Sequence, residues 1–254
     1  MKISLLIIIS AFLSFPVFAT TASALNANER LVYDVSWTGL KAATSVHEVT
    51  AKGNEMHIVS TTRSNPWLDT FFKVDDRAES IVTRGSGNRF GAPKYSRNKI
   101  QEGKHRRLKE AHFDPQRLKV ESRDLLEKTQ QVDTISANTF DSLSCVYYVR
   151  TLDLVPGRSV HVDIYDFKRL WSTEVKVLRR EEIVTPLGRF KTIVVKPMMK
   201  AEGYFSRSGD ITVWLTDDAL RIPVQMTTKV KIGKITATLS GGSYWPQREA
   251  SVRR

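Results

Sequence analysis

The feature that most constrains the fold is a two-residue alternation of apolar and polar side chains along most of the chain. In residues 31–37, large apolar side chains occupy the odd positions, with Asp34 and Ser36 between them. Successive side chains of a β-strand point to opposite faces of a sheet, so this period predicts a half-buried strand. Comparable segments recur at 46–51, 56–62, 74–83, 95–100, 106–113, 117–122, 160–165, 170–184, 190–195, 211–215, 223–232 and 235–239.

Roughly a dozen short strands with tight connections are typical of an all-β architecture. The connections carry turn residues, such as the glycines at 53, 103, 188 and 233. We therefore predict a mainly β, antiparallel fold. We expect a barrel-like or roll-like curved sheet, with a sandwich as the alternative.

One short helix is expected near residues 140–152, where the alternation stops. Asp141 is a suitable N-cap, and Pro156 with Gly157 would end the segment. The expected apolar stripe consists of Leu143, Val146, Tyr147 and Val149.

Residues 65–72 also lack alternation and are predicted to form a helical turn or a loop. The segment is rich in large apolar side chains, among them Trp67, Phe71 and Phe72. We expect these side chains to plug the core. An exposed apolar lip is the alternative.

The N-terminus has the three parts of a secretory signal peptide. Lys2 is followed by an apolar run at 5–15, which is shorter than the roughly 18 residues of a membrane-spanning helix. Small residues favour cleavage after Ala24, with Ala19 as the alternative. We therefore predict a signal peptide at 1–24, a single β-rich domain at 25–245 and a basic tail at 246–254. The mature protein would be periplasmic, without a transmembrane segment.

Charge and export together narrow the class of partner. The net charge is +12, from 39 Lys and Arg against 27 Asp and Glu. Nucleic acid is not expected outside the cytoplasm, whereas anionic lipids and glycans are abundant in a bacterial envelope and would be concentrated by a positive field. A well-solvated surface is the alternative explanation of the charge.

The hairpin at 94–109 is the strongest local concentration of cations. Alternation places Tyr95, Arg97 and Lys99 on one face of its first strand. A guanidinium group binds phosphate or carboxylate in a bidentate manner, whereas cations on exposed strands also discourage aggregation. The ligand-binding candidates are Arg77, Arg97, Lys99, Arg106 and Arg107.

Two acidic pairs, Asp75 with Asp76 and Asp217 with Asp218, are the catalytic candidates. A glycoside hydrolase holds two carboxylates about 5–9.5 Å apart across a sugar. Adjacent strand residues point to opposite faces, so only one member of the first pair can face a given cleft. An aspartate in a turn commonly accepts hydrogen bonds from its own backbone, which is the structural alternative for the second pair.

No metal site, cofactor or hydrolase nucleophile is expected. The five histidines, at 47, 57, 105, 112 and 161, lack metal-ligand spacing, although His47 and His57 are candidates to meet across a hairpin. Cys145 permits no intramolecular disulfide and is expected to be a buried small hydrophobe. Ser142 and Ser144 are expected to cap backbone amides at the helix start.

Six blocks of sequence carry a family resemblance. They are ERLVYDVSW at 29–37, FKVDDR at 72–77, DSLS and YYVR within 141–150, TPLGRF at 185–190, WLTDD at 214–218 and RIPV at 221–224. In order and spacing, these blocks resemble the bacterial exported family called domain of unknown function 3108. The resemblance implies an exported β-rich protein and supplies no catalytic residues.

Three functional hypotheses follow. The first is a non-enzymatic binding or envelope-assembly factor, whose curved sheet holds an anionic or amphiphilic lipid or glycan with cations at the rim of a cavity. The second is a carbohydrate-acting hydrolase that uses the paired aspartates. The third is a structural scaffold whose sheet edge recruits another envelope protein.

Overall fold

The computed structural model describes residues 28–84, 90–198, 211–230 and 232–245. The predicted signal peptide and basic tail lie outside these ranges. Within them, no helix is both long enough and apolar enough to cross a lipid bilayer.

A single sheet of fifteen strands forms most of the described chain, and every hydrogen-bonded neighbour except one is antiparallel. Its spatial order is β8-β7-β6-β5-β4-β3-β2-β1-β15-β14-β13-β12-β11-β10-β9. The strands are β1 (Asn28–Trp37), β2 (Leu40–Lys52), β3 (Glu55–Ser64), β4 (Asp75–Arg84), β5 (Phe90–Glu102), β6 (His105–Asp114), β7 (Lys119–Asp124), β8 (Thr129–Thr134), β9 (Thr139–Asp141), β10 (Ser159–Tyr165), β11 (Leu170–Thr185), β12 (Gly188–Met198), β13 (Thr212–Thr216), β14 (Pro223–Lys229) and β15 (Lys234–Gly242).

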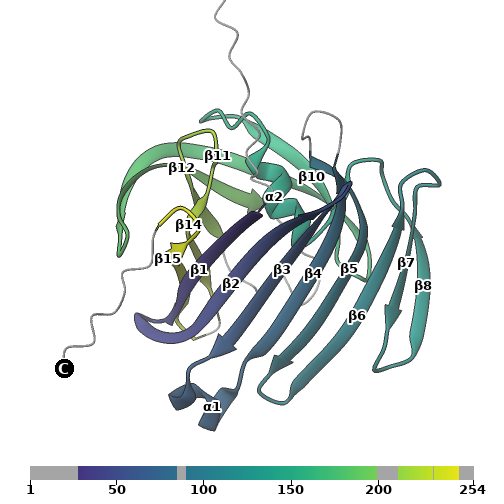
Figure 1. The fold of residues 1–254 in the computed structure, drawn as a ribbon, viewed down its shortest axis with the longest axis horizontal. Coiled ribbons are helices and arrows are strands. Elements are labelled where there is room, and N and C mark those ends of the chain that lie inside the picture. Colours follow the sequence, from purple (N-terminus) through teal and green to yellow (C-terminus); the bar gives the residue numbers. More distant parts are fainter. Residues whose placement is uncertain (1–27, 85–89, 199–210, 231, 246–254) are drawn as a thin grey trace, which may run out of the picture.

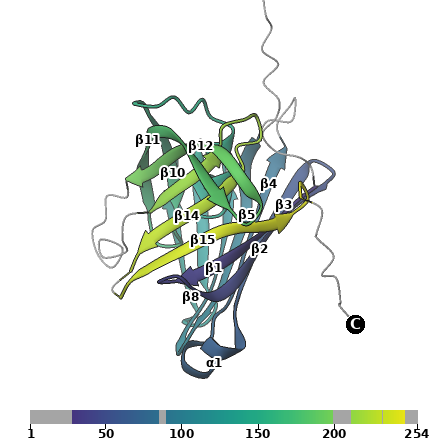
Figure 2. The ribbon, with the colours of Figure 1, turned by 90° about the vertical axis from the view of Figure 1, so that its left-hand side faces the viewer.

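The sheet curls strongly without closing through backbone hydrogen bonds (Figures 1 and 2). β8 and β9 are its two ends, and β9 pairs in parallel with β10. This arrangement confirms the expected mainly β, antiparallel, barrel-like curved sheet. The sandwich alternative is wrong, because one continuous sheet takes the place of two separate ones.

Side chains join the two ends of the sheet where the backbone does not. The Tyr165 hydroxyl on β10 donates to Ser122 Oγ on β7 at 2.9 Å. The Ser80 hydroxyl on β4 donates to Asp141 Oδ2 on β9 at 2.6 Å. Buried Phe113 packs edge-on against Tyr165. β9 and β10 therefore lie against the concave face of β4–β7, and the fold is a roll.

The helix α2 (Ser144–Arg150) lies within the curve of the sheet (Figure 1). It begins later than expected because Asp141, at the end of β9, accepts hydrogen bonds from the backbone amides of Leu143 and Ser144. The expected apolar stripe is wrong in part, since Val146 is exposed. The buried face is instead spaced by three residues and is largely polar: Ser144, Tyr147 and Arg150.

A second helix, α1 (Pro66–Phe72), occupies the segment expected to plug the core. None of its residues is buried, and Trp67, Phe71 and Phe72 are all exposed. The core plug is therefore wrong, and the exposed lip is what the structure shows. The physical reason is its position: α1 bridges β3 and β4 beyond the end of the sheet, at the bottom of Figure 1.

The interior around α2 is filled by apolar side chains. One cluster includes Val162, Ile193 and Leu215, inside the curve of β10–β13. Another joins Ile58 and Val82 to the α2 helix through Tyr147. The alternating apolar positions of the strands therefore line the interior in several packed clusters.

Candidate functional site

Four of the five predicted ligand-binding cations lie on the outer face of β4–β6. Arg77, Arg97, Lys99 and Arg106 are exposed, and we call them the outer strip. The opposite, concave face carries buried Ser80 and Ser96 on the same strands. The cations therefore form a strip on the convex surface, and the expected rim around a cavity is not observed.

The register brings like charges together within the outer strip. Lys99 of β5 lies directly opposite Arg77 of β4, and its other cross-strand partner is Leu108. Arg77 forms an ion pair with Glu79 on its own strand. Among the described residues, Lys99 has no acidic group within ion-pair distance. Directly opposed like charges destabilise a sheet, so an anion at this position would relieve the repulsion.

Arg97 is surrounded differently. Its cross-strand partners are Glu79 on β4 and Glu110 on β6, and Glu110 is in turn opposite Arg123. Charges of opposite sign thus alternate across four strands in this row. Because Arg97 already faces two carboxylates, the Arg77 and Lys99 row is the more electropositive part of the strip.

Arg107 is the predicted candidate that the structure places elsewhere. It alternates with exposed Arg106 and therefore points to the concave face of β6. One of its terminal nitrogens donates to the Asp166 carbonyl at 3.2 Å, and its guanidinium lies over the Phe167 ring. These contacts help to join β6 to the β10–β11 connection. Arg107 is thus separated by the sheet from the other four cations.

The acidic candidates are dispersed. Asp75 and Asp76 begin β4 beside α1, whereas Asp217 and Asp218 follow β13, in the connection whose Leu220 carbonyl accepts a hydrogen bond from Arg150 of α2. Asp75 pairs with Arg63 at 3.4 Å and Asp217 pairs with Arg180 at 2.8 Å. No hydrogen bond connects the two pairs in the described chain.

Asp76 and Asp218 each have a local role. Asp218 accepts hydrogen bonds from the backbone amides of Leu220 and Arg221, which is the turn chemistry expected as its alternative. Asp76 accepts one from the Gln101 amide at 2.8 Å. Burial raises the pKa of Asp76 to about 6, and the nearby Glu102 carboxylate adds to the increase. These four aspartates therefore form no pair that faces across a cleft.

The histidines and the cysteine do not form a reactive centre. His47 and His57 do not meet, because their cross-strand partners are Ser60 and Thr50 respectively. Among the described residues, no group of three His, Cys, Asp or Glu side chains is arranged to hold a metal ion. Burial raises the pKa of the Cys145 thiol to about 12, so this thiol remains protonated at neutral pH.

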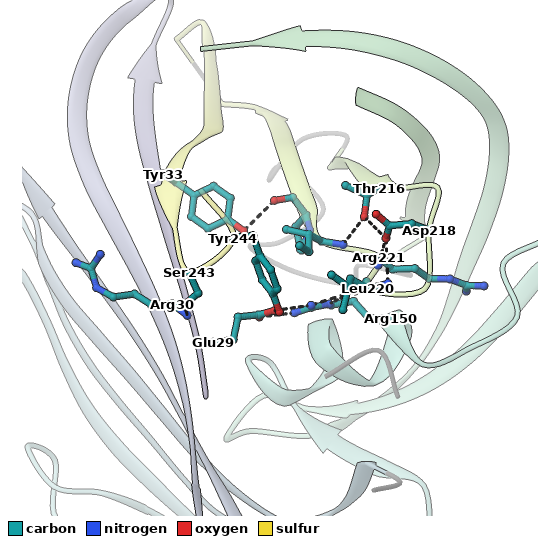
Figure 3. Close-up of polar contacts among 12 residues, drawn as sticks. Glu29, Arg30, Tyr33, Arg150, Thr216, Asp218, Leu220, Arg221, Ser243 and Tyr244 are labelled. Carbon is teal, nitrogen blue, oxygen red and sulfur yellow. Dashed lines mark hydrogen bonds and ion pairs between the residues drawn. The ribbon is translucent and has the colours of Figure 1, made fainter. Parts of the chain in front are cut away.

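A buried ion pair, which the sequence did not single out, is the centre of a polar cluster beside α2 (Figure 3). Arg150 of α2 binds Glu29 of β1 in a bidentate manner, with distances of 2.7 and 2.8 Å. The exposed fractions of the two side chains are 0% and 1%. Arg150 also donates to the Leu220 carbonyl, and Tyr244 donates to Glu29 at 3.0 Å.

Around this pair, one contact lies within α2 and others join distant segments. The Arg150 guanidinium lies 5.3 Å from the centre of the Tyr147 ring. Tyr33 donates to the Pro223 carbonyl at 2.9 Å and packs against the His47 ring. Burial lowers the pKa of His47 to about 4, and Arg150 contributes further. The cluster is satisfied internally, so its role is to hold α2, β1 and the β13–β14 connection together.

The sequence blocks that carry the family resemblance contain or adjoin residues of this cluster. Glu29 opens the first block, Arg150 closes the third, and Leu220 lies between the last two. These segments are far apart in the sequence and meet only in the folded chain (Figure 3). Residue type alone could not pair them, because the chain contains many other arginines and glutamates.

A shallow surface depression lies beside this cluster at the start of β1. It has a volume of about 230 Å³ and is lined mainly by β1, β2 and Ser243. The Arg30 to Glu48 ion pair, at 3.4 Å, lies along it. Typical ligand pockets have volumes of roughly 300–1,000 Å³, and this depression is smaller. We therefore place the candidate site on the outer strip.

One solved structure with a similar fold agrees with the curved sheet described above. The chain is similar to a β-barrel-like protein of the domain of unknown function DUF1849 from Brucella abortus. The TM-score is 0.53 and the identity 12%, covering 85% of this chain and 97% of that one. It also aligns with a candidate lipoprotein from Parabacteroides distasonis, with a TM-score of 0.31 and 10% identity, covering 86% of this chain and 96% of that one. No curated protein matches the chain.

A family profile matches residues 32–240, which include strands from both ends of the sheet. The match covers the outer strip and nearly all of the curved sheet. The chain therefore belongs to the family described as protein of unknown function (DUF3108).

Proposed function

We propose that the protein is a non-enzymatic binding or assembly factor of the bacterial periplasm, which holds an anionic envelope glycan or lipid headgroup on the outer strip. The signal-like N-terminus supports export, and the net charge of +12 favours an anionic partner. The observation that carries the proposal is the direct opposition of Arg77 and Lys99, with no acidic group within ion-pair distance of Lys99 among the described residues.

The chemistry of the strip suits phosphate or carboxylate groups. Arginine offers a planar pair of donors that matches these groups, and lysine adds a compact charge. Both side chains lie on regular strands, so their backbone positions are rigid. A ligand that bridges Arg77 and Lys99 would replace their repulsion with two favourable contacts.

Binding of a soluble phosphorylated or sulfated oligosaccharide tests the proposal, with its neutral parent sugar as a control. We expect the Arg77→Gln, Lys99→Gln and Arg106→Gln triple variant to bind about tenfold more weakly or worse. Binding by the wild type should also weaken as salt is added. The matched control is the Arg117→Gln, Arg158→Gln and Lys176→Gln variant, which loses the same charge from exposed positions elsewhere. Equal weakening in both variants would show a nonspecific charge effect and contradict the site.

The scaffold hypothesis is a second candidate because of β8. This strand is one end of the sheet, is mostly exposed, and among the described strands pairs with β7 alone. An edge strand with unpaired backbone groups can accept a strand from a partner. Amide hydrogen exchange tests this candidate: protection of β8 that appears only with envelope extract would support it. Unchanged exchange would count against it.

The hydrolase hypothesis receives no geometric support from the dispersed aspartates. Its test is the release of reducing ends from envelope glycans by the purified protein. Activity that disappears in both Asp76→Asn and Asp217→Asn variants would revive it.

A further inference from the structure

Six large apolar side chains are exposed at the α1 end of the sheet. They come from the β1–β2 turn, from α1 and from the β14–β15 turn (Figures 1 and 2). Phe71 is 80% exposed and Ile232 is 74% exposed. A concentration of apolar surface like this one marks a contact with another molecule or a membrane. We call this set the lip: Trp37, Leu40, Trp67, Phe71, Phe72 and Ile232.

Hydrogen bonds connect the parts of the lip. The Trp37 indole donates to the Ile232 carbonyl at 2.8 Å, and Trp37 is the cross-strand partner of Leu40. The Trp67 indole donates to the carbonyl of Lys41, the next residue after Leu40, at 3.0 Å. Both indole N–H groups are thus satisfied while parts of the side chains remain exposed. The lip is a connected surface of the folded chain.

The helix α1 is held firmly in place at both ends. The Asn65 amide donates to the Ala42 carbonyl, and the Gly103 amide donates to the Lys73 carbonyl, both at 2.8 Å. A Cβ atom on Gly103 would lie 2.8 Å from the Phe72 ring, so this ring packs directly on the β5–β6 turn. The exposure of Phe71 therefore results from a fixed backbone position.

Cations flank the lip. Lys73, Lys104 and Lys234 are exposed on the segments that carry it or adjoin it. The carboxylates near the lip include Asp34, Asp75 and Glu102. Asp69 also lies there and accepts a hydrogen bond from Ser64. Asp75 is paired with Arg63 and Asp34 with Lys41. An apolar centre beside lysines complements a surface with a negative headgroup layer above hydrocarbon.

We propose that the lip docks the protein on the surface of an anionic lipid bilayer. Tryptophan favours the boundary between headgroups and acyl chains, where its ring is apolar and its N–H is polar. Phenylalanine and leucine would enter the outer acyl region, while the lysines would contact phosphate groups. The inference goes beyond the proposed function, because it concerns a different surface and would stand if the outer strip bound nothing.

Vesicle sedimentation of the full mature chain tests this inference. The vesicles are phosphatidylcholine alone, and phosphatidylcholine mixed with an equal part of phosphatidylglycerol. We expect wild type to partition preferentially into the mixed vesicles. The Leu40→Ser and Phe71→Ser double variant should bind them roughly tenfold more weakly or worse, since two exposed apolar side chains no longer enter the bilayer. The Lys73→Gln and Lys104→Gln variant should lose roughly tenfold on mixed vesicles and little on neutral ones.

The matched control is the Val132→Ser and Val184→Ser variant, which removes two exposed apolar side chains outside the lip. It should bind vesicles like wild type. Equal vesicle binding by wild type and the Leu40→Ser and Phe71→Ser variant would overturn the inference. A change of oligomeric state in that variant, without loss of vesicle binding, would also overturn it and assign the lip to contacts between copies. The Arg77→Gln and Lys99→Gln variant, which leaves Arg106 beside the lip intact, should retain most vesicle binding while losing oligosaccharide binding, so the two proposals fail separately.

Discussion

Two regions of the molecule, the interior around α2 and the surface around α1, use the same kinds of side chain in opposite ways. Near α2, Arg150 is fully enclosed and bound to Glu29, and aromatic rings pack around it. Near α1, lysines reach solvent beside Trp67 and Phe71, which are exposed. Buried charge satisfied within the protein specifies which segments meet, whereas exposed charge beside apolar surface is available to an external partner. We therefore expect substitutions around Arg150 to change the stability of the protein, and substitutions in the lip to change its binding to other molecules.

The largest expected effect comes from breaking the buried pair. Arg150→Met should reduce the free energy of unfolding by about 3–5 kcal/mol, because Glu29 would remain buried without its partner. Urea denaturation measures the change. Arg30→Met is the matched control: Arg30 is the next residue after Glu29, is exposed, and should cost less than about 1 kcal/mol.

The double variant Glu29→Leu and Arg150→Met sharpens this result. The double variant has no buried Glu29 carboxylate without a partner. It should therefore recover much of the stability that Arg150→Met alone loses. A double variant as unstable as the sum of its two single changes would show no coupling between Glu29 and Arg150 and would contradict this account.

A smaller effect is expected from His47 on acidification. Burial lowers its pKa from 6.5 to about 4, so the unfolded chain binds the proton first as pH falls. Stability should therefore be lost between these two values, by about 2 kcal/mol from this group. His47→Gln should reduce the acid sensitivity in urea denaturation over this range. His161→Gln, an exposed control, should leave the acid sensitivity unchanged.

Asp76 should show the opposite dependence, with a still smaller effect. Burial raises its pKa to about 6, so its stabilising contribution is present below the unfolded value and is lost as pH rises through the folded value. Asp76→Asn mimics the protonated form and should stabilise the protein at neutral pH by about 1 kcal/mol, after allowance for solvent screening. The difference should vanish near pH 4. Destabilisation by Asp76→Asn at neutral pH would contradict this account, and Asp75→Asn serves as the neighbouring control.

The smallest expected effect on stability is at the lip. Phe71→Ser should change the free energy of unfolding by less than about 0.5 kcal/mol, because the ring is largely exposed. Phe140→Ala is the comparison, since Phe140 is buried and stacks on Tyr148, and should cost about 3–5 kcal/mol. Thermal unfolding of both variants measures the contrast. A large loss in Phe71→Ser would mean that the lip belongs to the packed structure.

The alternation predicted most strands because each has one face on the interior. Residues 31–37, for example, fall within β1, where Leu31 and Tyr33 are buried and Val35 is partly buried. The missed strands do not show this pattern. β8 (Thr129–Thr134) is mostly polar because it is an exposed edge, and β9 (Thr139–Asp141) is buried throughout. An alternating sequence pattern arises when one face of a strand is exposed to solvent and the other is buried. Neither β8 nor β9 has this arrangement.

In the outer strip too, some features follow from the local sequence and others depend on the fold. Strand periodicity was sufficient to place Arg97 and Lys99 on one face, because that relation is local. The opposition of Lys99 to Arg77 depends on register between strands, and the position of Arg107 depends on which face of β6 is concave. No local pattern contains that information.

The sequence by itself determined a predominantly antiparallel β-structure, the faces of most strands and the excess of positive charge, because these follow from residue type and a period of two. Only the tertiary structure decided that Glu29 meets Arg150, 121 positions away, and that the aromatic side chains of α1 face outward. Both outcomes depend on how the whole sheet curls. Curvature is the sum of small twists and bulges over fifteen strands, so it is a property of the assembled chain.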